Sequence, residues 1–229
     1  MSIWQTISDA VAAVGDSLLT VLKRIAGQPR ERDPQSSVAF TIGMIALGAK
    51  MAKADGVVTA DEVTAFRQVF HIQPEELTNV ARVFNLAKQD VAGYDAYARQ
   101  VERLFTDRPE ILEDVMDGLF HIAKADGVVK DEELEYLRSV AGIFGLESRF
   151  RCISARHIKA AENDPYEVLG IEPCVLDDEL RQHYRRLVRD NHPDRHIAAG
   201  VPEELIAIAT DRLAAINSAY DLVARERGL

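Results

Sequence analysis

A histidine and an aspartate flank a proline near the C-terminal end of the chain, directly after a run of arginines. The triplet is His192-Pro193-Asp194, and the four arginines lie between positions 181 and 189. Histidine and carboxylate side chains could act as a general acid and base, but such catalysis also needs a nucleophile, a second carboxylate or a cofactor loop. None accompanies the triplet, and no glycine-rich phosphate-binding motif occurs in the chain. These residue types therefore predict a binding surface, not an enzyme, with no cofactor.

The residues before the triplet have the spacing of an amphipathic helix. Asp177 is expected to be its N-cap, and Asp178 and Glu179 fall in the first turn, where carboxylates stabilise unpaired N–H groups. The apolar positions that follow form one buried face: Leu180, Tyr184, Leu187 and Val188. The basic positions project from the other side: Arg181, Arg185, Arg186 and Arg189. The sequence thus predicts four cations on an exposed helix face.

This helix is expected to stop at the triplet. Pro193 has no backbone donor, and its ring disfavours the helical conformation at His192, so His192 and Asp194 are expected on a solvent-exposed loop. A second helix is predicted from about Pro202 to about Arg225, with apolar residues at a spacing of three or four. The two helices are expected to pair as an antiparallel hairpin with the triplet at its tip.

The hairpin carries the landmarks of a known family. In order, they are residues 164–171 (DPYEVLGI), 184–187 (YRRL), 192–194 (HPD) and 216–220 (INSAY). This segment resembles a J domain, the DnaJ-type co-chaperone module. The resemblance implies that the basic helix and the triplet dock on a DnaK-type ATPase chaperone and accelerate its ATP hydrolysis. The chaperone-binding residues it implies are Arg181, Tyr184, Arg185, Arg186, Arg189, His192, Pro193 and Asp194. Asp190 departs from the family pattern, because many J domains carry a lysine there.

The composition limits the classes of partner. With 229 residues and 47% hydrophobic content, the chain is long enough for two domains with their own cores. Its net charge of −10 argues against nucleic-acid binding, which needs a broad cationic surface. The arginines of residues 181–189 are instead a local patch suited to an acidic protein surface. Cys152 and Cys174 have neither a CxxC partner nor metal-ligand spacing and are expected to be reduced thiols.

The N-terminal segment, residues 1–26, is predicted to form an amphipathic helix with a narrow apolar seam. Two aspartates, Asp9 and Asp16, argue against a membrane-spanning helix, and no basic residue precedes the apolar stretch as in a secretory signal. Packing on the chain's own helical domain, self-association and contact with a membrane surface all remain open for this helix. Residues 27–37 are polar, contain two prolines and are predicted to be a linker.

An internal repeat marks residues 38–158. The segment 52–58 (AKADGVV) is identical to 123–129, and each copy predicts a helix, a tight turn at Asp-Gly and a second helix. Gly56 and Gly127 can adopt positive φ at these turns. Thr59 and Glu62 form a capping box in the first copy, and Asp131 is expected to share the capping in the second. The pattern resembles the TerB domain, named for tellurite resistance, which precedes the J domain in DjlA-like proteins.

The Asp-Gly turns also raise the question of calcium. If Gly56 is placed at position 6 of an EF-hand loop, Glu62 falls at position 12, but Met51 and Lys53 occupy positions 1 and 3. In the second copy, Ile122 and Lys124 stand at those positions. Because two carboxylate ligands are missing and a lysine replaces one of them, the sequence favours turn and capping roles and predicts no metal site.

Together these patterns predict an all-α protein with four parts: a helix (1–26), a linker (27–37), a TerB-like helical bundle (38–158) and a J domain (159–229). The predicted function is that of a DjlA-like co-chaperone whose TerB-like domain selects clients or location. Its client is not specified by the sequence. The alternative is a TerB-type metal or stress-response binding protein with an auxiliary J domain. The expected location is the cytoplasm, with the inner face of the membrane as a peripheral site.

Overall fold

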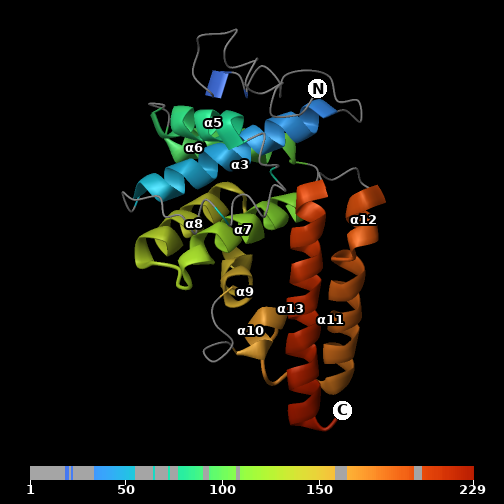
Figure 1. The fold of residues 1–229 in the computed structure, drawn as a ribbon. Helices are drawn as coiled ribbons and strands as arrows, with labels where there is room; N and C mark the ends of the chain where they lie inside the picture. The colour runs from blue at the N-terminus through green and yellow to red at the C-terminus, as the bar shows by residue number, and fades with distance from the viewer. Residues whose placement is uncertain are drawn as a thin grey trace.

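The computed structural model describes residues 19, 20, 22, 34–54, 64, 72, 77–89, 93–106, 109–157, 164–198 and 203–229. Within these residues all regular structure is helical, as the sequence predicts (Figure 1). The helices of the first part are α3 (Pro34–Ala54), α5 (Leu77–Gln89), α6 (Tyr94–Leu104), α7 (Pro109–Ala123), η2 (Lys124–Asp126), α8 (Asp131–Ile143), η3 (Glu147–Arg149) and α9 (Phe150–Ala155). The C-terminal part contains α10 (Pro165–Leu169), α11 (Asp177–Asp190), α12 (Pro193–Ala198) and α13 (Glu203–Arg227).

Helix α3 lies at the centre of the first part and packs against α5, α6, α7 and α8. Its side chains from Thr41 to Met51 are all buried, as expected for a helix that is apolar around most of its circumference. Gly43 brings α3 close to α6, because a Cβ atom there would lie 2.5 Å from Cγ2 of Val101. The two backbones therefore approach where a side chain would not fit.

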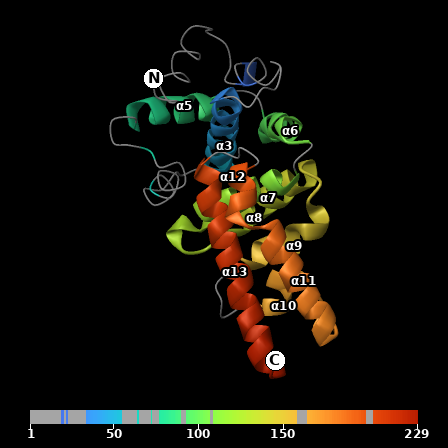
Figure 2. The same cartoon turned by 90° about the vertical axis from the view of Figure 1, so that its right-hand side faces the viewer.

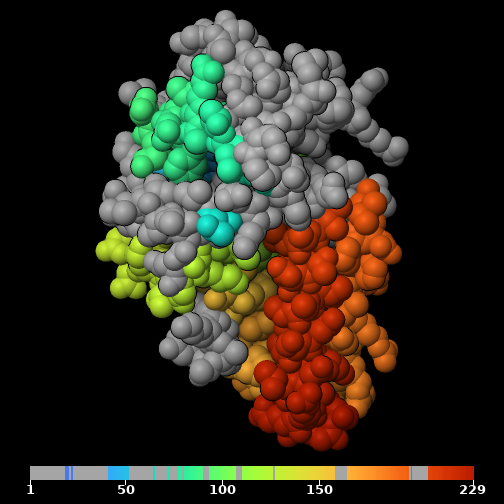
Figure 3. All heavy atoms as spheres, viewed as in Figure 1, coloured from blue at the N-terminus to red at the C-terminus, as the bar shows by residue number. Residues whose placement is uncertain are grey.

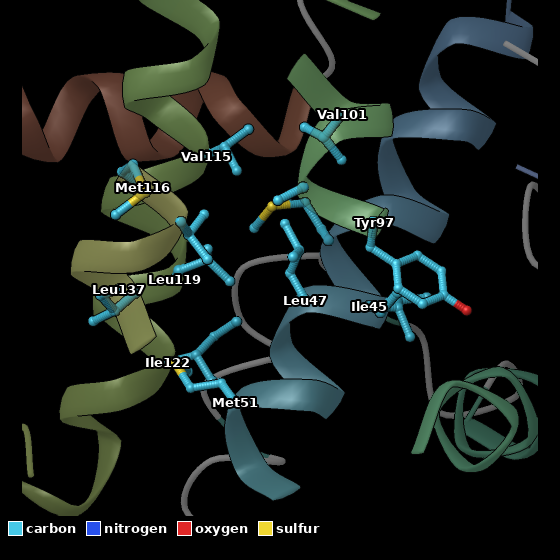
Figure 4. Close-up of a cluster of buried hydrophobic side chains, with 14 of the residues drawn as sticks. Ile45, Leu47, Met51, Tyr97, Val101, Val115, Met116, Leu119, Ile122 and Leu137 are labelled. Atoms are coloured by element: carbon cyan, nitrogen blue, oxygen red, sulfur yellow. The ribbon is translucent and has the colours of Figure 1, made fainter. Parts of the chain in front are cut away.

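The first hydrophobic core lies between α3, α6, α7 and α8. Figure 4 shows Leu47 and Met51 of α3 among residues of the facing helices, including Leu119 of α7 and Leu137 of α8. These four side chains are fully buried. Leu22, from the segment predicted to be an amphipathic helix, is also fully buried in this core, with Leu19 packed against it. Leu19 and Leu22 of that segment thus pack on the chain's own helical domain.

The second core joins α10, α11 and α13. Leu180 of α11 and Val223 of α13 are fully buried, and Leu169 of α10 is 1% exposed. The rings of Tyr184 and Tyr220 stack with centroids 3.8 Å apart and planes at 6°. The hairpin predicted from the apolar spacing therefore forms, and Figures 1 and 2 show α11 and α13 side by side along its length.

The two cores share α13. Ile208, near the start of α13, belongs to the first core, whereas Ile216 and Val223 belong to the second. A Cβ atom on Gly118 of α7 would lie 3.0 Å from Cδ1 of Ile208, so the two helices meet closely. Figure 3 shows α13 running along the surface from the layer that contains α7 to the opposite end of the molecule. One helix thus connects both parts.

The second copy of the internal repeat forms the predicted turn. Gly127 has φ 102°, and its N–H donates to the carbonyl of Lys124 at 2.9 Å. The capping prediction for Asp131 is wrong. Asp131 is the first residue of α8, and Glu133 accepts a bond from the N–H of Lys130 at 2.9 Å, because its longer side chain reaches back over the first turn. The corresponding turn at Gly56 lies outside the described residues.

Among the described residues, no helix is long and apolar enough to cross a membrane. Cys152 and Cys174 are both free thiols. Residues 27–33 of the predicted linker lie outside the described residues. The prediction is wrong for residues 34–37, which form the start of α3, because proline is favoured at the first helical position.

Candidate functional site

Helix α11 presents most of the predicted arginines on one face. Its first residue is Asp177, so the N-cap position belongs to Leu176 and the N-cap prediction for Asp177 is wrong. Asp177 instead accepts a bond from Arg227 at 2.9 Å, which draws its carboxylate towards α13. Arg185, Arg186 and Arg189 are exposed, and Arg181 is half-buried. The basic face predicted from the sequence is therefore present in the folded chain.

A shallow groove of about 450 Å³ borders this face. It is lined by Ile171, Val175, Glu179, Gln182, His183, Arg185, Arg186 and Arg189. His183 fixes one of the arginines, because its Nδ1 accepts from Arg186 at 2.7 Å while its Nε2 donates to the carbonyl of Leu169 at 2.8 Å. The neutral tautomer of His183 satisfies both bonds. The groove thus combines apolar walls with ordered cationic groups.

Tyr184 does not lie with the arginines. It is half-buried between α11 and α13, where it stacks on Tyr220 and donates to Oδ1 of Asn217 at 3.1 Å. Burial raises the pKa of its hydroxyl above the usual value, with Asp221 adding to the effect. The phenol therefore remains protonated and serves the packing of the hairpin.

The His-Pro-Asp triplet lies at the end of α11. Its imidazole is 48% exposed, and the carboxylate of Asp194 is 84% exposed. Only His192 lies outside a helix, because Pro193 begins α12, whose first turn includes Asp194. The prediction that Asp194 lies on a loop is therefore wrong. Proline is favoured at the first helical position, where no donor is needed, so it ends one helix and starts the next.

Two contacts order the triplet. The N–H of Asp194 donates to Nδ1 of His192 at 3.2 Å, and the two side chains approach to 3.6 Å. Beside them, Arg195 donates to Asp190 at 3.0 Å across the turn between α11 and α12. His192, Pro193 and Asp194 thus lie together at the end of the helix that carries the arginines.

Asn191, the residue before the triplet, is 8% exposed. Its amide donates to the carbonyl of Leu187 at 2.8 Å and so caps the end of α11. Its Oδ1 accepts from Nη1 of Arg212 at 3.0 Å. The turn that carries the triplet is therefore tied to α13.

Arg212 connects this turn to the first part of the molecule. It is 3% exposed, its Nε donates to Asp117 of α7 at 2.6 Å, and its Nη2 pairs with Asp114. Burial would lower the pKa of Arg212, but Asp117 and Asp114 outweigh it and raise the pKa above its usual value. The guanidinium is thus a permanent buried cation with three partners.

The carboxylates on α7 have further cationic partners. Asp117 lies 3.6 Å from Nη2 of Arg156, whereas Glu113 pairs with Arg156 at 2.7 Å and with Arg149 at 2.5 Å. Burial would raise the pKa of Asp117, but Arg156 and Arg212 hold it well below its usual range. The buried carboxylates thus remain charged at neutral pH.

His157 completes this cluster. Its Nε2 donates to Asp117 at 2.7 Å, its Nδ1 contacts Lys124 at 3.3 Å, and its ring stacks on Phe120 with centroids 5.0 Å apart. Burial lowers the pKa of His157 and outweighs the opposing effect of Asp117. The ring is therefore neutral, with one nitrogen donating and the other accepting.

The sequence did not predict the roles of Asn191 and of the buried cluster around Arg212. Two signals were present: Asp114 and Asp117 interrupt an otherwise largely apolar stretch of α7, and Arg212 interrupts the apolar spacing of α13. Charged residues are rarely fully buried unless they are paired. Such interruptions therefore predict partners, although they do not identify them.

The described residues contain no group of three or more His, Cys, Asp or Glu side chains arranged to hold a metal ion. At the Asp-Gly turn of the second repeat, Glu133 is buried and bonded to the backbone of Lys130. The residue that would close a calcium loop thus has a structural role.

Comparison with known proteins matches both parts of the chain. Residues 41–157 match the family model of the tellurite resistance protein TerB, and residues 164–227 match that of the DnaJ domain. The chain is similar to the co-chaperone protein DjlA of Coxiella burnetii, with 27% identity over 200 residues, covering 78% of this chain and 74% of the relative. Its similarity to DjlA of Photobacterium profundum is 25% over 229 residues, covering 88% of this chain and 83% of the relative. No solved structure matches significantly.

Proposed function

Because the chain belongs to the TerB family and carries a DnaJ domain behind its TerB domain, we propose that it is a co-chaperone that stimulates ATP hydrolysis by a DnaK-type chaperone. Relatives that align with most of its length are named co-chaperone protein DjlA. The observation that carries the proposal is the exposed His-Pro-Asp triplet at the end of the arginine-bearing face of α11.

The proposed docking surface consists of Arg181, Arg185, Arg186 and Arg189 together with His192, Pro193 and Asp194. The arginines steer and hold an acidic surface of the ATPase, because exposed charges act mainly on the rate of association. The triplet makes short-range contacts once the complex has formed. Tyr184 supports this surface from within the hairpin through its stack on Tyr220.

The remaining parts have proposed roles of their own. The domain of residues 38–158 selects clients or location, and the J domain of residues 159–229 engages the ATPase. The proposed location is the cytoplasm or the inner face of the membrane. Peripheral membrane contact is proposed for residues 1–26, and deletion of residues 1–18, which keeps the buried Leu22, should lower recovery of the protein in the membrane fraction.

The decisive experiment measures steady-state ATP hydrolysis by a DnaK-type chaperone with the full-length protein. His192→Gln and Asp194→Asn are expected to abolish stimulation. The free energy of unfolding should stay within about 0.5 kcal/mol of the wild-type value, because both side chains are exposed. Asp221→Asn is the matched control, since Asp221 is an exposed aspartate on α13, and it should stimulate normally. Normal stimulation by a folded His192→Gln protein contradicts the proposal.

The basic face is tested by charge reversal. Arg185→Glu combined with Arg186→Glu is expected to lower affinity mainly through the association rate, and added salt should reproduce part of the loss. The control pair, Arg82→Glu with Arg225→Glu, changes the net charge equally at exposed sites on α5 and α13. Equal effects of the two pairs would show that only net charge matters.

A further inference from the structure

A single arginine contacts both the turn before the His-Pro-Asp triplet and the TerB domain. Arg212 donates to Asn191 through Nη1, to Asp117 through Nε and to Asp114 through Nη2. The two aspartates belong to α7 and lie 98 and 95 positions away from Arg212 in the sequence. The three nitrogens of the Arg212 guanidinium thus link the turn before the triplet to α7 of the TerB domain.

The guanidinium has little freedom to move. The side chains of Arg212, Asp114 and Asp117 are 1%, 0% and 3% exposed. A planar guanidinium presents its donors in a fixed fork, and charge-assisted bonds are stronger than neutral ones. With two nitrogens engaged by carboxylates on one rigid helix, the third has a set direction. The position of Nη1 is therefore dictated by α7.

Asn191 connects the fixed Nη1 of Arg212 to the backbone of the triplet. Its side chain is held from both sides, because Nδ2 donates to Leu187 and Oδ1 accepts from Arg212. His192 follows immediately, and Pro193 begins α12 with a restricted φ. The backbone between Asn191 and Asp194 has few remaining degrees of freedom once the asparagine is fixed.

We propose that Arg212 is a positioning residue for the His192-Pro193-Asp194 triplet, and that Asp114 and Asp117 of the TerB domain hold it in place. The TerB domain thereby completes the chaperone-docking site of the J domain, in addition to any role in selecting clients. This inference rests on the proposed co-chaperone function.

A purely structural role for Arg212 makes a different prediction. Domain attachment alone would change melting and leave stimulation intact at temperatures where the variant is folded. A positioning role lowers the maximal stimulation of the ATPase in the folded variant, because the triplet is misplaced after docking. The concentration for half-maximal stimulation changes less, since the arginines of α11 remain. A fall in maximal stimulation that exceeds the change in the half-maximal concentration indicates a positioning role, whereas a purely structural role changes neither value in the folded variant.

The experiment uses the full-length protein with Arg212→Met. Maximal stimulation is expected to fall about tenfold, which lies within the usual range of about 5- to 150-fold for coupled sites. Arg212→Lys keeps the positive charge but lacks the planar set of donors, so this variant should retain only part of the wild-type stimulation. Arg227→Met is the matched control: the same substitution on the same helix removes bonds to Tyr166, Asp177 and two carbonyls far from the triplet. It is expected to stimulate as wild type does.

Asn191→Ala supplies a second route that leaves the buried ion pairs in place. It is expected to lower maximal stimulation to a similar extent, and combining it with Arg212→Met should add little, because both changes break the same link. Amide hydrogen exchange at residues 192–195 should accelerate in both variants, and the Arg227→Met protein should show no such change. Should Arg212→Met fail to fold, Asn191→Ala alone decides.

The outcomes separate this inference from the proposed function. If wild type fails to stimulate the ATPase, the proposed function itself is wrong. If wild type stimulates and His192→Gln does not, the function stands. In that case, wild-type stimulation by folded Arg212→Met and by Asn191→Ala overturns the positioning role. Exchange at residues 192–195 that is unchanged in both variants would equally overturn it.

Discussion

The two ends of α13 hold the same hairpin by opposite means. Arg212, near the start, is fully buried and paired with two buried carboxylates and an asparagine. Arg227, in the last turn, bonds Tyr166, Asp177 and the carbonyls of Pro173 and Val175 near the surface. Removal of one partner from a buried ion pair is strongly destabilising, because it leaves an unpaired charge in the interior. An exposed pair contributes little, because water can replace the lost partner. The triplet lies at the end of α13 where the charged groups are buried and paired.

The largest expected effect comes from removing one carboxylate of the buried cluster. Asp117→Ala leaves Arg212 and Arg156 with a lost partner in the interior, and such changes cost about 3–5 kcal/mol. Asp177→Ala, at the other end of the hairpin, should cost much less because its side chain is 50% exposed. Urea unfolding followed by circular dichroism measures both. Equal losses would erase the contrast between the two ends.

A paired replacement sharpens the comparison. Arg212→Met with Asp114→Leu removes both members of one buried pair, and apolar replacements of such pairs are often neutral or stabilising. The double variant should be more stable than Arg212→Met alone by roughly 1–3 kcal/mol. Under the positioning inference, the same protein still stimulates the ATPase poorly. Stability that remains as low as in the single variant would show that the buried ions are not directly coupled.

A smaller effect concerns pH. Burial lowers the pKa of His157 in the folded chain below the unfolded value of about 6.5, so protonation favours unfolding. The contribution of His157 to the free energy of unfolding is complete above pH 6.5. It declines as the pH falls below that value, with a slope of at most about 1.4 kcal/mol per pH unit. His157→Gln should flatten the dependence of the free energy of unfolding on pH below about 6.5. His121 contributes a slope in the same direction, because burial and Lys124 also lower its pKa. An unchanged slope would contradict the account of His157.

The smallest effect is expected at the exposed pair beside the triplet. Asp190→Asn loosens the contact with Arg195, but both side chains are more than 40% exposed, so stability should change by less than about 0.5 kcal/mol. The resemblance to J domains implies a lysine near this position in many members of that family. Asp190→Lys should therefore bind the ATPase at least as fast as wild type. A large loss of stability would show that the turn depends on this pair.

Local patterns predicted much of the fold. The all-α class, the hairpin of α11 and α13, the exposed arginines and the turn at Gly127 follow from spacing and turn chemistry, and the structure confirms them. The resemblance to DjlA-like proteins with a TerB domain and a J domain is also confirmed. The helices, the exposed arginines and the turn depend on residues a few positions apart, and such local patterns can be recognised in the sequence.

The remainder depended on contacts that no local pattern encodes. Arg212 pairs with residues 95 and 98 positions away, and several carboxylates could equally have been its partners. The short helix α12 was missed because Pro193 was interpreted only as a stop, although proline also begins helices. Asp177 was predicted as a cap because it fits that role, but Arg227, 50 positions later, draws its carboxylate away.

The sharing of α13 between two cores has a consequence for synthesis of the chain. Ile208 fills part of the core around α3 and α7, and Arg212 neutralises the carboxylates of α7, yet both are made after every other helix of that core. Until then Asp114 and Asp117 lack that cation, and burying α7 is correspondingly costly. The TerB domain therefore cannot reach its final packing until α13 has been made, whereas an independent N-terminal domain could do so earlier. Completion of both cores therefore depends on α13, so a chain cut before this helix would have an unfinished first core.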